Sequence, residues 1–224
     1  LGEDSNLTGI SLQTHYPDFR EVYPSVVKWM QRSKERGRSW VVACDEPGDA
    51  QHSLLPDEED PDHDNARKNA LWGVLMAGGA GIEWYFGYRH AESDLTCQDW
   101  RSRDRVWGLC RYASRLIKEY RIPFWDMSVA NHLSSTGDWV LSGQQDGGER
   151  VILVYLKQGG RSEVRLPSGD FDYGWFNPRS SSGLGELINP GNNSGNGHLS
   201  RIVSFTAPDE KDWVLLIKQT NQGR

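Results

Sequence analysis

The sequence predicts an α/β region followed by an all-β region. Up to about residue 121, short apolar runs alternate with segments whose apolar residues recur every three or four positions, as on one face of a helix. From residue 122 onward, short β-rich runs are separated by turns rich in glycine, asparagine, aspartate and serine. Ile122 precedes Pro123 where the pattern changes, and a residue before proline is disfavoured in a helix. We therefore predict one domain over residues 1–121 and a second over 122–224.

The α/β region opens with a strand, a helix and a second strand. Gly9–Tyr16 is strand-like and stops at Pro17. The apolar spacing from Phe19 to Met30 predicts a helix, which Gly37 closes as its C-cap. Trp40–Cys44 is a nearly continuous apolar run, of the kind that is buried on both faces of a parallel sheet.

Two more helices and one more strand follow. Residues 66–75 and Val106–Tyr120 have helical spacing, and Ile82–Phe86 is predicted as the third strand. Strands that alternate with helices imply parallel pairing. Three such units fit either a doubly wound sheet or the last three units of an eightfold (β/α) TIM barrel. No strand is followed by a Gly-x-Gly-x-x-Gly turn, so the dinucleotide-binding version of the doubly wound sheet loses support.

The second region contains about seven short β-rich runs. Strands of this length and spacing predict an antiparallel β-sandwich. The runs are Trp139–Ser142, Arg150–Leu156, Ser162–Leu166, Phe171–Phe176, Glu186–Ile188, Arg201–Phe205 and Trp213–Lys218.

Composition excludes several classes of protein. With 25 basic and 31 acidic residues the net charge is −6, which argues against a nucleic-acid binder. No apolar run approaches the ~18 residues of a membrane-spanning helix, and no signal peptide is visible. Three cysteines are too few for a disulfide scaffold. The ten tryptophans, eight tyrosines and six phenylalanines suit either stacking on sugar rings or a core built from large residues.

Glu46 is the strongest candidate for a catalytic residue. It ends an apolar strand and precedes the turn-forming Pro47. In an eightfold barrel the active site lies at the carboxyl ends of the strands, and glycosidic cleavage needs two carboxyl groups. The alternative is that Glu46 only caps the turn.

Other polar and aromatic residues stand at the same predicted sheet edge. His15 and Tyr16 end the first strand, and Trp84 and Tyr85 lie in the third. Aromatic rings and hydrogen-bonding side chains at a barrel mouth suit substrate binding. Packing against the helices is an equally good interpretation for Trp84.

The sequence predicts neither a metal site nor a cofactor. The acidic run Asp57–Asp64 offers oxygen ligands for calcium but lacks the spacing of an EF-hand, so a solvated loop is the better interpretation. The zinc motif His-Glu-x-x-His and the Gly-x-Ser-x-Gly elbow of serine hydrolases are both absent.

Several stretches carry a resemblance to a known family. Trp40–Gly48 (WVVACDEPG) and Leu71–Tyr88 (LWGVLMAGGAGIEWYFGY) resemble the end of the barrel in a bacterial glycoside-hydrolase-like family. The segments Pro123–Met127 (PFWDM), Val151–Leu156 (VILVYL) and Trp175–Arg179 (WFNPR) resemble the β-sandwich module known as the collagen-binding domain of a collagenase.

The resemblance implies a retaining glycoside hydrolase that acts on a polysaccharide or glycan. Glu46 would be the nucleophile at the end of strand seven, and the acid/base carboxylate would lie upstream of Leu1. The alternative is a collagenase, or a protein whose sandwich binds collagen or polysaccharide through aromatic residues such as Tyr173, Trp175 and Trp213. A third hypothesis gives the sandwich only a structural role. Because polymer-degrading enzymes act outside the cytoplasm, we expect an extracellular or periplasmic location.

Overall fold

A computed structural model describes residues 1, 5–145, 147–189 and 201–220. It divides the chain into two compact units, Leu1–Cys110 and Arg111–Arg224. Helix α3 (Asp104–Glu119) begins in the first unit and continues into the second. The sequence-based boundary at residues 121 and 122 lies just after this helix, and the assignment of domains stays a prediction.

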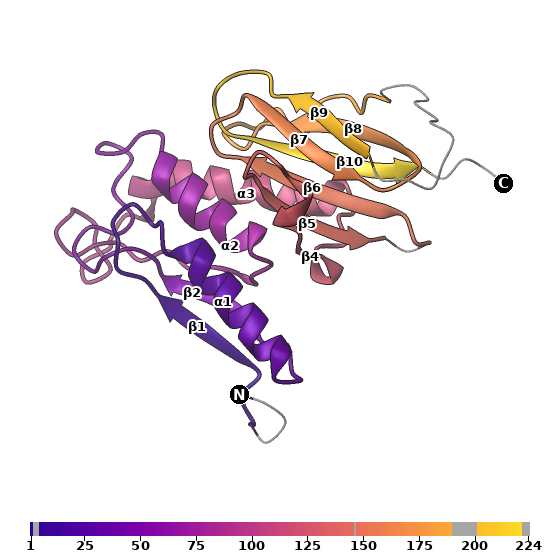
Figure 1. Cartoon of the computed structure of the whole chain (residues 1–224). Coiled ribbons are helices and arrows are strands. Elements are labelled where there is room, and N and C mark those ends of the chain that lie inside the picture. The colour runs from indigo at the N-terminus through magenta and orange to yellow at the C-terminus, as the bar shows by residue number, and fades with distance from the viewer. Residues whose placement is uncertain (2–4, 146, 190–200, 221–224) are drawn as a thin grey trace. The chain divides into compact units, whose positions relative to one another are not determined.

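The first unit contains a small sheet and the helices that follow its strands (Figure 1). Its elements are β1 (Gly9–Gln13), α1 (Val22–Glu35), β2 (Val41–Glu46), the π-helical turn η1 (Ala66–Leu71), α2 (Trp72–Met76), β3 (Gly81–Ile82), the 3₁₀ turn η2 (Trp100–Arg103) and the first turns of α3.

The three strands pair in parallel, in the order β1-β2-β3. Ile10 lies beside Val42, and Cys44 lies beside Ile82. The prediction of parallel strands is therefore confirmed. Strand order follows chain order, as expected when each crossover helix returns the chain to the next position. The described sheet is open, so the complete barrel stays a prediction.

The helices cover one face of this sheet. Val42 and Cys44 on β2 are 0% exposed and join Val22 and Val26 of α1 in one hydrophobic core. Side chains alternate between the two faces of a strand. Val41, on the other face, is 62% exposed. The prediction that the run Trp40–Cys44 is buried on both faces is therefore wrong for the described residues, because only one layer of helices packs against it.

The third strand is shorter than predicted. It ends at Ile82, and the predicted residues Trp84, Tyr85 and Phe86 lie beyond it. The chain turns away because the loop after β2 offers it other partners: the amide of Leu54 donates to the carbonyl oxygen of Tyr85 at 3.0 Å. The backbone of Tyr85 therefore pairs with the loop after β2 and not with the sheet.

The first helix also begins later than its apolar pattern suggests. Phe19 has a positive φ of 59° and precedes α1, which starts at Val22. Gly37 follows the helix with φ 88°, the left-handed conformation expected of a glycine at the end of a helix.

The second unit is rich in antiparallel strands (Figure 1). Its elements after α3 are η3 (Phe124–Asp126), β4 (Ser128–Val129), η4 (Asn131–Leu133), β5 (Trp139–Gln144), β6 (Arg150–Leu156), β7 (Arg161–Leu166), β8 (Asp170–Phe176), β9 (Arg201–Thr206) and β10 (Trp213–Thr220).

These strands form two sheets around one core. The five-stranded sheet has the order β4-β5-β6-β10-β8, and β7 pairs with β9. Buried residues from both sheets share a hydrophobic cluster, among them Val154 on β6, Val164 on β7 and Leu215 on β10. This arrangement agrees with antiparallel pairing, while the β-sandwich assignment stays a prediction. The predicted strand Glu186–Ile188 is wrong, since Ile188 forms only an isolated bridge to Tyr173.

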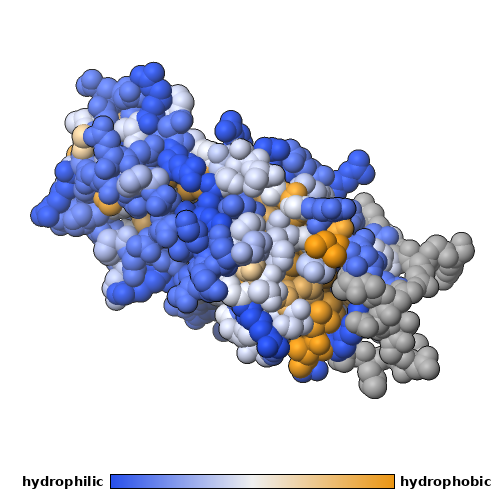
Figure 2. All heavy atoms as spheres, turned by 90° about the horizontal axis from the view of Figure 1, so that it is seen from above, coloured by the Kyte–Doolittle hydropathy of each residue, from blue (hydrophilic) through white to orange (hydrophobic). Residues whose placement is uncertain are grey.

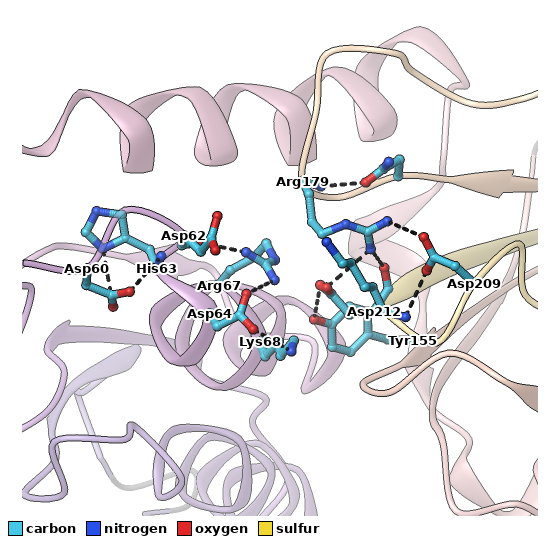
Figure 3. A network of polar contacts seen from close by, with 12 residues as sticks. Asp60, Asp62, His63, Asp64, Arg67, Lys68, Tyr155, Arg179, Asp209 and Asp212 are labelled. Atoms are coloured by element: carbon cyan, nitrogen blue, oxygen red, sulfur yellow. Dashed lines mark hydrogen bonds and ion pairs between the residues drawn. The ribbon is translucent and has the colours of Figure 1, made fainter. Parts of the chain in front are cut away.

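A polar cluster fixes the turn after β8 to the start of β10. Arg179 lies 3.4 Å from Asp212 and 3.5 Å from Asp209, and its guanidinium stands over the ring of Trp213 (Figure 3). The hydroxyl of Tyr155 donates to Asp212, which is 0% exposed. The arginine of the WFNPR segment therefore has a structural role within this unit.

The surfaces of the two units differ. On the face that Figure 2 shows, apolar residues gather over the β-rich unit, and the other unit is mostly hydrophilic. Residues 1–110 contain 12 basic and 19 acidic residues, against 13 and 12 in residues 111–224. The net negative charge of the chain therefore belongs to the α/β unit. No helix among the described residues is long and apolar enough to cross a membrane.

Candidate functional site

Glu46 lies at the carboxyl end of the middle strand. Its carbonyl oxygen accepts from the amide of Thr14 at 3.0 Å, and the hydroxyl of Thr14 accepts from the amide of Gly48 at 2.8 Å. The register between β1 and β2 shifts at this point, where Gln13 pairs with Glu46. The backbone of Glu46 is thus held on both sides while its side chain is exposed.

The charge of Glu46 contributes to the pKa of Tyr85. Burial raises the pKa of the Tyr85 phenol, and the negative charges of Asp94 and Glu46 raise it further. The amide of Glu83 donates to the carbonyl oxygen of Cys44 at 2.9 Å, which keeps the chain after β3 beside the end of β2. Of the predicted site residues, Tyr85 is thus the one whose pKa is affected by the charge of Glu46.

Trp84 is held mainly by packing. Its indole Nε1 donates to the Cys110 sulfur at 3.3 Å, and its ring meets Phe19 edge-on at 6.3 Å between centroids. It is half-buried and packs against the core of the first unit. These contacts account for the conformation of Trp84, and its contact with a substrate stays a prediction.

His15 and Tyr16 follow β1 and are both exposed. The amide of His15 donates to the carboxylate of Glu21 at 3.1 Å. The guanidinium of Arg20 lies 3.7 Å from the centroid of the Tyr16 ring, so one face of that ring is already occupied. These contacts of His15 and Tyr16 are local, and the part of both residues in substrate binding stays a prediction.

Two carboxylate–histidine pairs in the loops after β2 and β3 escaped the sequence analysis. Nδ1 of His52 lies 2.8 Å from Asp49, and Nδ1 of His90 lies 3.0 Å from Glu59. The two imidazole rings are 5.8 Å apart. An ionised carboxylate can only accept, so Nδ1 of each ring carries a proton, and Nε2 is an acceptor when the ring is neutral. Nε2 of His90 is buried without a hydrogen-bond partner among the described residues, whereas the His52 side chain is 45% exposed, so His52 is the ring that a solvent or ligand hydroxyl can reach.

The Asp49 carboxyl is well suited to orient its histidine. Burial alone would raise the pKa of Asp49, but hydrogen bonds from the His52 ring and from the amides of Gln51 and His52 outweigh it and lower the pKa. The Asp-x-x-His spacing directly after an apolar strand was the one sequence signal for this pair. His90 had no such signal, because Glu59 is 31 residues away.

The two loops are joined by backbone pairing and by one buried arginine. The amides of Tyr88 and Arg89 donate to the carbonyl oxygens of Ala50 and Gln51, at 3.2 and 3.1 Å. Arg103 is 0% exposed, and its guanidinium donates to carbonyl oxygens of both loops, including those of Leu54 and Ala91. These contacts give the region around Glu46 a fixed frame.

Part of the acidic run Asp57–Asp64 contacts basic side chains of the same unit. His63, which is fully buried, lies 2.7 Å from Asp57, and Arg67 and Lys68 both contact Asp64 (Figure 3). Burial alone would raise the pKa of Asp64, but hydrogen bonds from Lys68 and Arg67 lower it. No group of three or more metal-ligating side chains occurs in the described part of the chain.

Asp57 and Asp64 therefore help to hold the loop after β2, while Glu58, Glu59, Asp62 and Asp64 are exposed to solvent. The loop is solvated as expected, and it has local contacts to Arg67 and Lys68 of the following helical segment and to its own His63. Arg67 also donates to the carbonyl oxygen of Asp62 at 2.8 Å.

Comparisons with known proteins gave likenesses in structure only. No protein-family model matches the chain, and no curated protein matches it in sequence. Solved structures similar to it include a GH27 β-L-arabinopyranosidase from Geobacillus stearothermophilus (11% identity, 98% of this chain and 46% of that one, TM-score 0.46). An α-amylase from Geobacillus thermoleovorans matches at 13% identity over 90% of this chain and 47% of its own, with TM-score 0.47.

The catalytic domain of GH30 xylanase C from Talaromyces cellulolyticus is also similar, at 13% identity and TM-score 0.40, over 95% of this chain and 52% of that one. This chain thus spans about half the length of each of these glycoside hydrolases. At such identities and TM-scores the likeness assigns neither a fold nor an activity to this chain. The functional argument rests on the geometry at the end of β2.

Proposed function

We propose that this chain is part of a carbohydrate-active glycoside hydrolase that cleaves O-glycosyl bonds with retention, with Glu46 as the nucleophile. The observation that carries the proposal is the exposed carboxylate of Glu46 at the carboxyl end of a parallel strand. Side chains at this end of parallel strands converge on one site.

In this proposal the Glu46 carboxylate attacks the anomeric carbon while an acid/base carboxyl upstream of Leu1 protonates the leaving oxygen. The same carboxyl then activates the water that hydrolyses the glycosyl-enzyme. The two carboxyl groups of a retaining site stand about 5–5.5 Å apart. His15, Tyr16, Trp84 and Tyr85 are the proposed substrate-binding residues. Since glycan polymers lie outside the cytoplasm, the proposal includes an extracellular or periplasmic location.

The test is the Glu46→Gln substitution in the full-length protein, assayed on a panel of aryl glycosides and polysaccharides. We expect kcat to fall by at least about 100-fold, as for loss of a group that takes part in the chemical step. Glu83→Gln is the matched control, because Glu83 is also an exposed glutamate just beyond a strand of this sheet. Wild-type activity in the Glu46→Gln protein would refute the assignment.

The collagen-binding alternative has no supporting observation on the described residues. Its aromatic candidates pack within the β unit: Tyr173 meets Phe205 edge-on at 5.0 Å, and Trp175 meets Trp213 at 6.4 Å. All three candidate rings are partly buried against the core cluster. A flat adhesive face built from these residues is therefore not the arrangement that the structure describes.

A further inference from the structure

The β-rich unit has a hollow of its own, far along the chain from Glu46. Its volume is about 280 Å³, and it lies where β5 begins, β6 ends and β7 begins. This is just below the ~300–1,000 Å³ typical of small-molecule pockets, which limits an occupant to something of about one sugar ring. The residues that matter for its chemistry are Thr136, Asp138, Trp139, Tyr155, Lys157 and Arg161.

One wall of the hollow is aromatic. Trp139 on β5 lies opposite Tyr155 on β6, and their rings stack with 5.9 Å between centroids and 28° between planes. Tyr155 is fully buried, and its hydroxyl is fixed by Asp212. Trp139 is half-buried and lines the hollow. The ring of Trp139 is thus the part of this wall that remains partly accessible.

Two cations stand at the same hollow. The ammonium of Lys157 lies 4.7 Å from the centroid of the Trp139 ring, a cation–π distance. The guanidinium of Arg161 donates through Nε to Ser204 at 2.7 Å and through Nη2 to Glu163 at 2.7 Å. An arginine has five N–H donors, so these two bonds hold the guanidinium in place and use only two of its donors.

The carboxylate at the hollow is already committed to the protein. Oδ2 of Asp138 accepts from the hydroxyls of Ser134 at 3.0 Å, Thr136 at 2.5 Å and Ser162 at 2.6 Å. Its charge therefore serves to order the segment before β5. The basic groups that line the hollow are Lys157 and Arg161, and the Arg161 guanidinium also pairs with the Glu163 carboxylate at 2.7 Å.

We propose that this hollow is a binding subsite for an acidic sugar, with the carboxylate of a uronic acid held by Lys157 and Arg161 and its C–H surface against Trp139. Charge-assisted hydrogen bonds from both cations would select the carboxylate, and the indole would exclude water from one side of the ring. That the ligand is a sugar rests on the proposed function, whereas its acidic character rests on the hollow alone.

The test measures binding, not hydrolysis, so that its failure is distinguishable from that of the Glu46 assignment. The 224-residue chain is titrated by isothermal calorimetry with an oligogalacturonate, and with a neutral malto-oligosaccharide of the same length. We expect the acidic oligosaccharide to bind at least about tenfold more tightly, the difference made by one charge-assisted hydrogen bond.

Substitutions locate the site. Lys157→Met should weaken oligogalacturonate binding at least about tenfold, and Trp139→Leu should weaken it further. Trp125→Leu is the matched control, because Trp125 is 80% exposed in the same unit and does not line the hollow. Circular dichroism checks that each variant folds, and Lys157→Met, which removes no core residue, keeps the test valid if Trp139→Leu unfolds.

Three results would overturn the proposal. They are the absence of oligogalacturonate binding, equal affinity for the neutral oligosaccharide, and wild-type affinity in the Lys157→Met variant.

Discussion

Replacing Arg179 with methionine is expected to destabilise the protein by about 3–5 kcal/mol, because it leaves the buried carboxylate of Asp212 without its cation. The Arg179 side chain is only 14% exposed and that of Asp212 is 0% exposed, so solvent does little to screen this pair. The second partner, Asp209, is 47% exposed and adds no more than about 1 kcal/mol.

The assay is urea unfolding followed by circular dichroism. Arg115→Met is the control, because its ion pair with Glu119 lies on the surface of α3, with side chains 44% and 48% exposed. This control should cost no more than about 1 kcal/mol. In an Asp212→Asn background the cost of Arg179→Met should fall by about 1.5 kcal/mol or more, since hydrogen bonds to charged groups contribute that much.

The reasoning fails if Arg179→Met costs no more than Arg115→Met. It also fails if Arg179→Met costs the same with and without the Asp212 carboxylate, because the cost would then come from lost packing against Trp213 rather than from an unpaired charge.

Three further predictions concern the first unit. Burial, together with the charge of the neighbouring Asp45 carboxylate, raises the pKa of Cys44 to about 12. Iodoacetamide at pH 8 should therefore label the exposed Cys97 in the native protein, and Cys44 only after unfolding. Peptide mass spectrometry measures the labelling of each cysteine. Gly87→Ala should cost about 1–3 kcal/mol in urea unfolding, because its Cβ would lie 2.3 Å from a carbonyl oxygen of the facing loop; Gly185→Ala, whose Cβ would meet its nearest atom at 3.5 Å, should cost less, and an equal cost would contradict the argument. The pKa of Asp64 is lowered from its ordinary 3.8 in the folded state, so the contribution of this carboxylate to stability is complete above pH 3.8 and is lost as the pH falls through the lower folded-state value. The Asp64→Asn variant should therefore lose less stability than the wild type when the pH is lowered from 5 to 2.

Elements that depend on local sequence patterns were predicted well. The periodicity of Val106–Tyr120 matches α3, and the run Arg150–Leu156 matches β6 residue for residue. Val106–Tyr120 repeats apolar residues at helical spacing, and Arg150–Leu156 is a continuous apolar run that is buried after Arg150. Ile82–Phe86 and Glu186–Ile188 were predicted as strands. Only Ile82 of the first segment lies in a strand of the structure, and no residue of the second does, because other segments of the chain supplied their backbone partners.

The candidate site was predicted only in part. Glu46 became a candidate because the end of an apolar strand is visible in the sequence, and Tyr85 because it was predicted to lie in the next strand. The pairing of His90 with Glu59 joins two loops, and no spacing reveals it. The hollow at Trp139 was missed for the same reason, since it needs the ends of three strands side by side.

The sequence by itself determined the order of helices and strands, the change from an α/β to a β-rich region, and the acidic character of the first. Periodicity and turn residues are properties of short stretches of sequence, and the charge is a sum over residues, so none of them depends on tertiary contacts. Only the tertiary structure decided that Val41 is exposed, that His90 pairs with Glu59, and that Arg179 and Tyr155 meet at Asp212. Those outcomes depend on which distant segments pack together, because each of these contacts joins residues far apart in the chain.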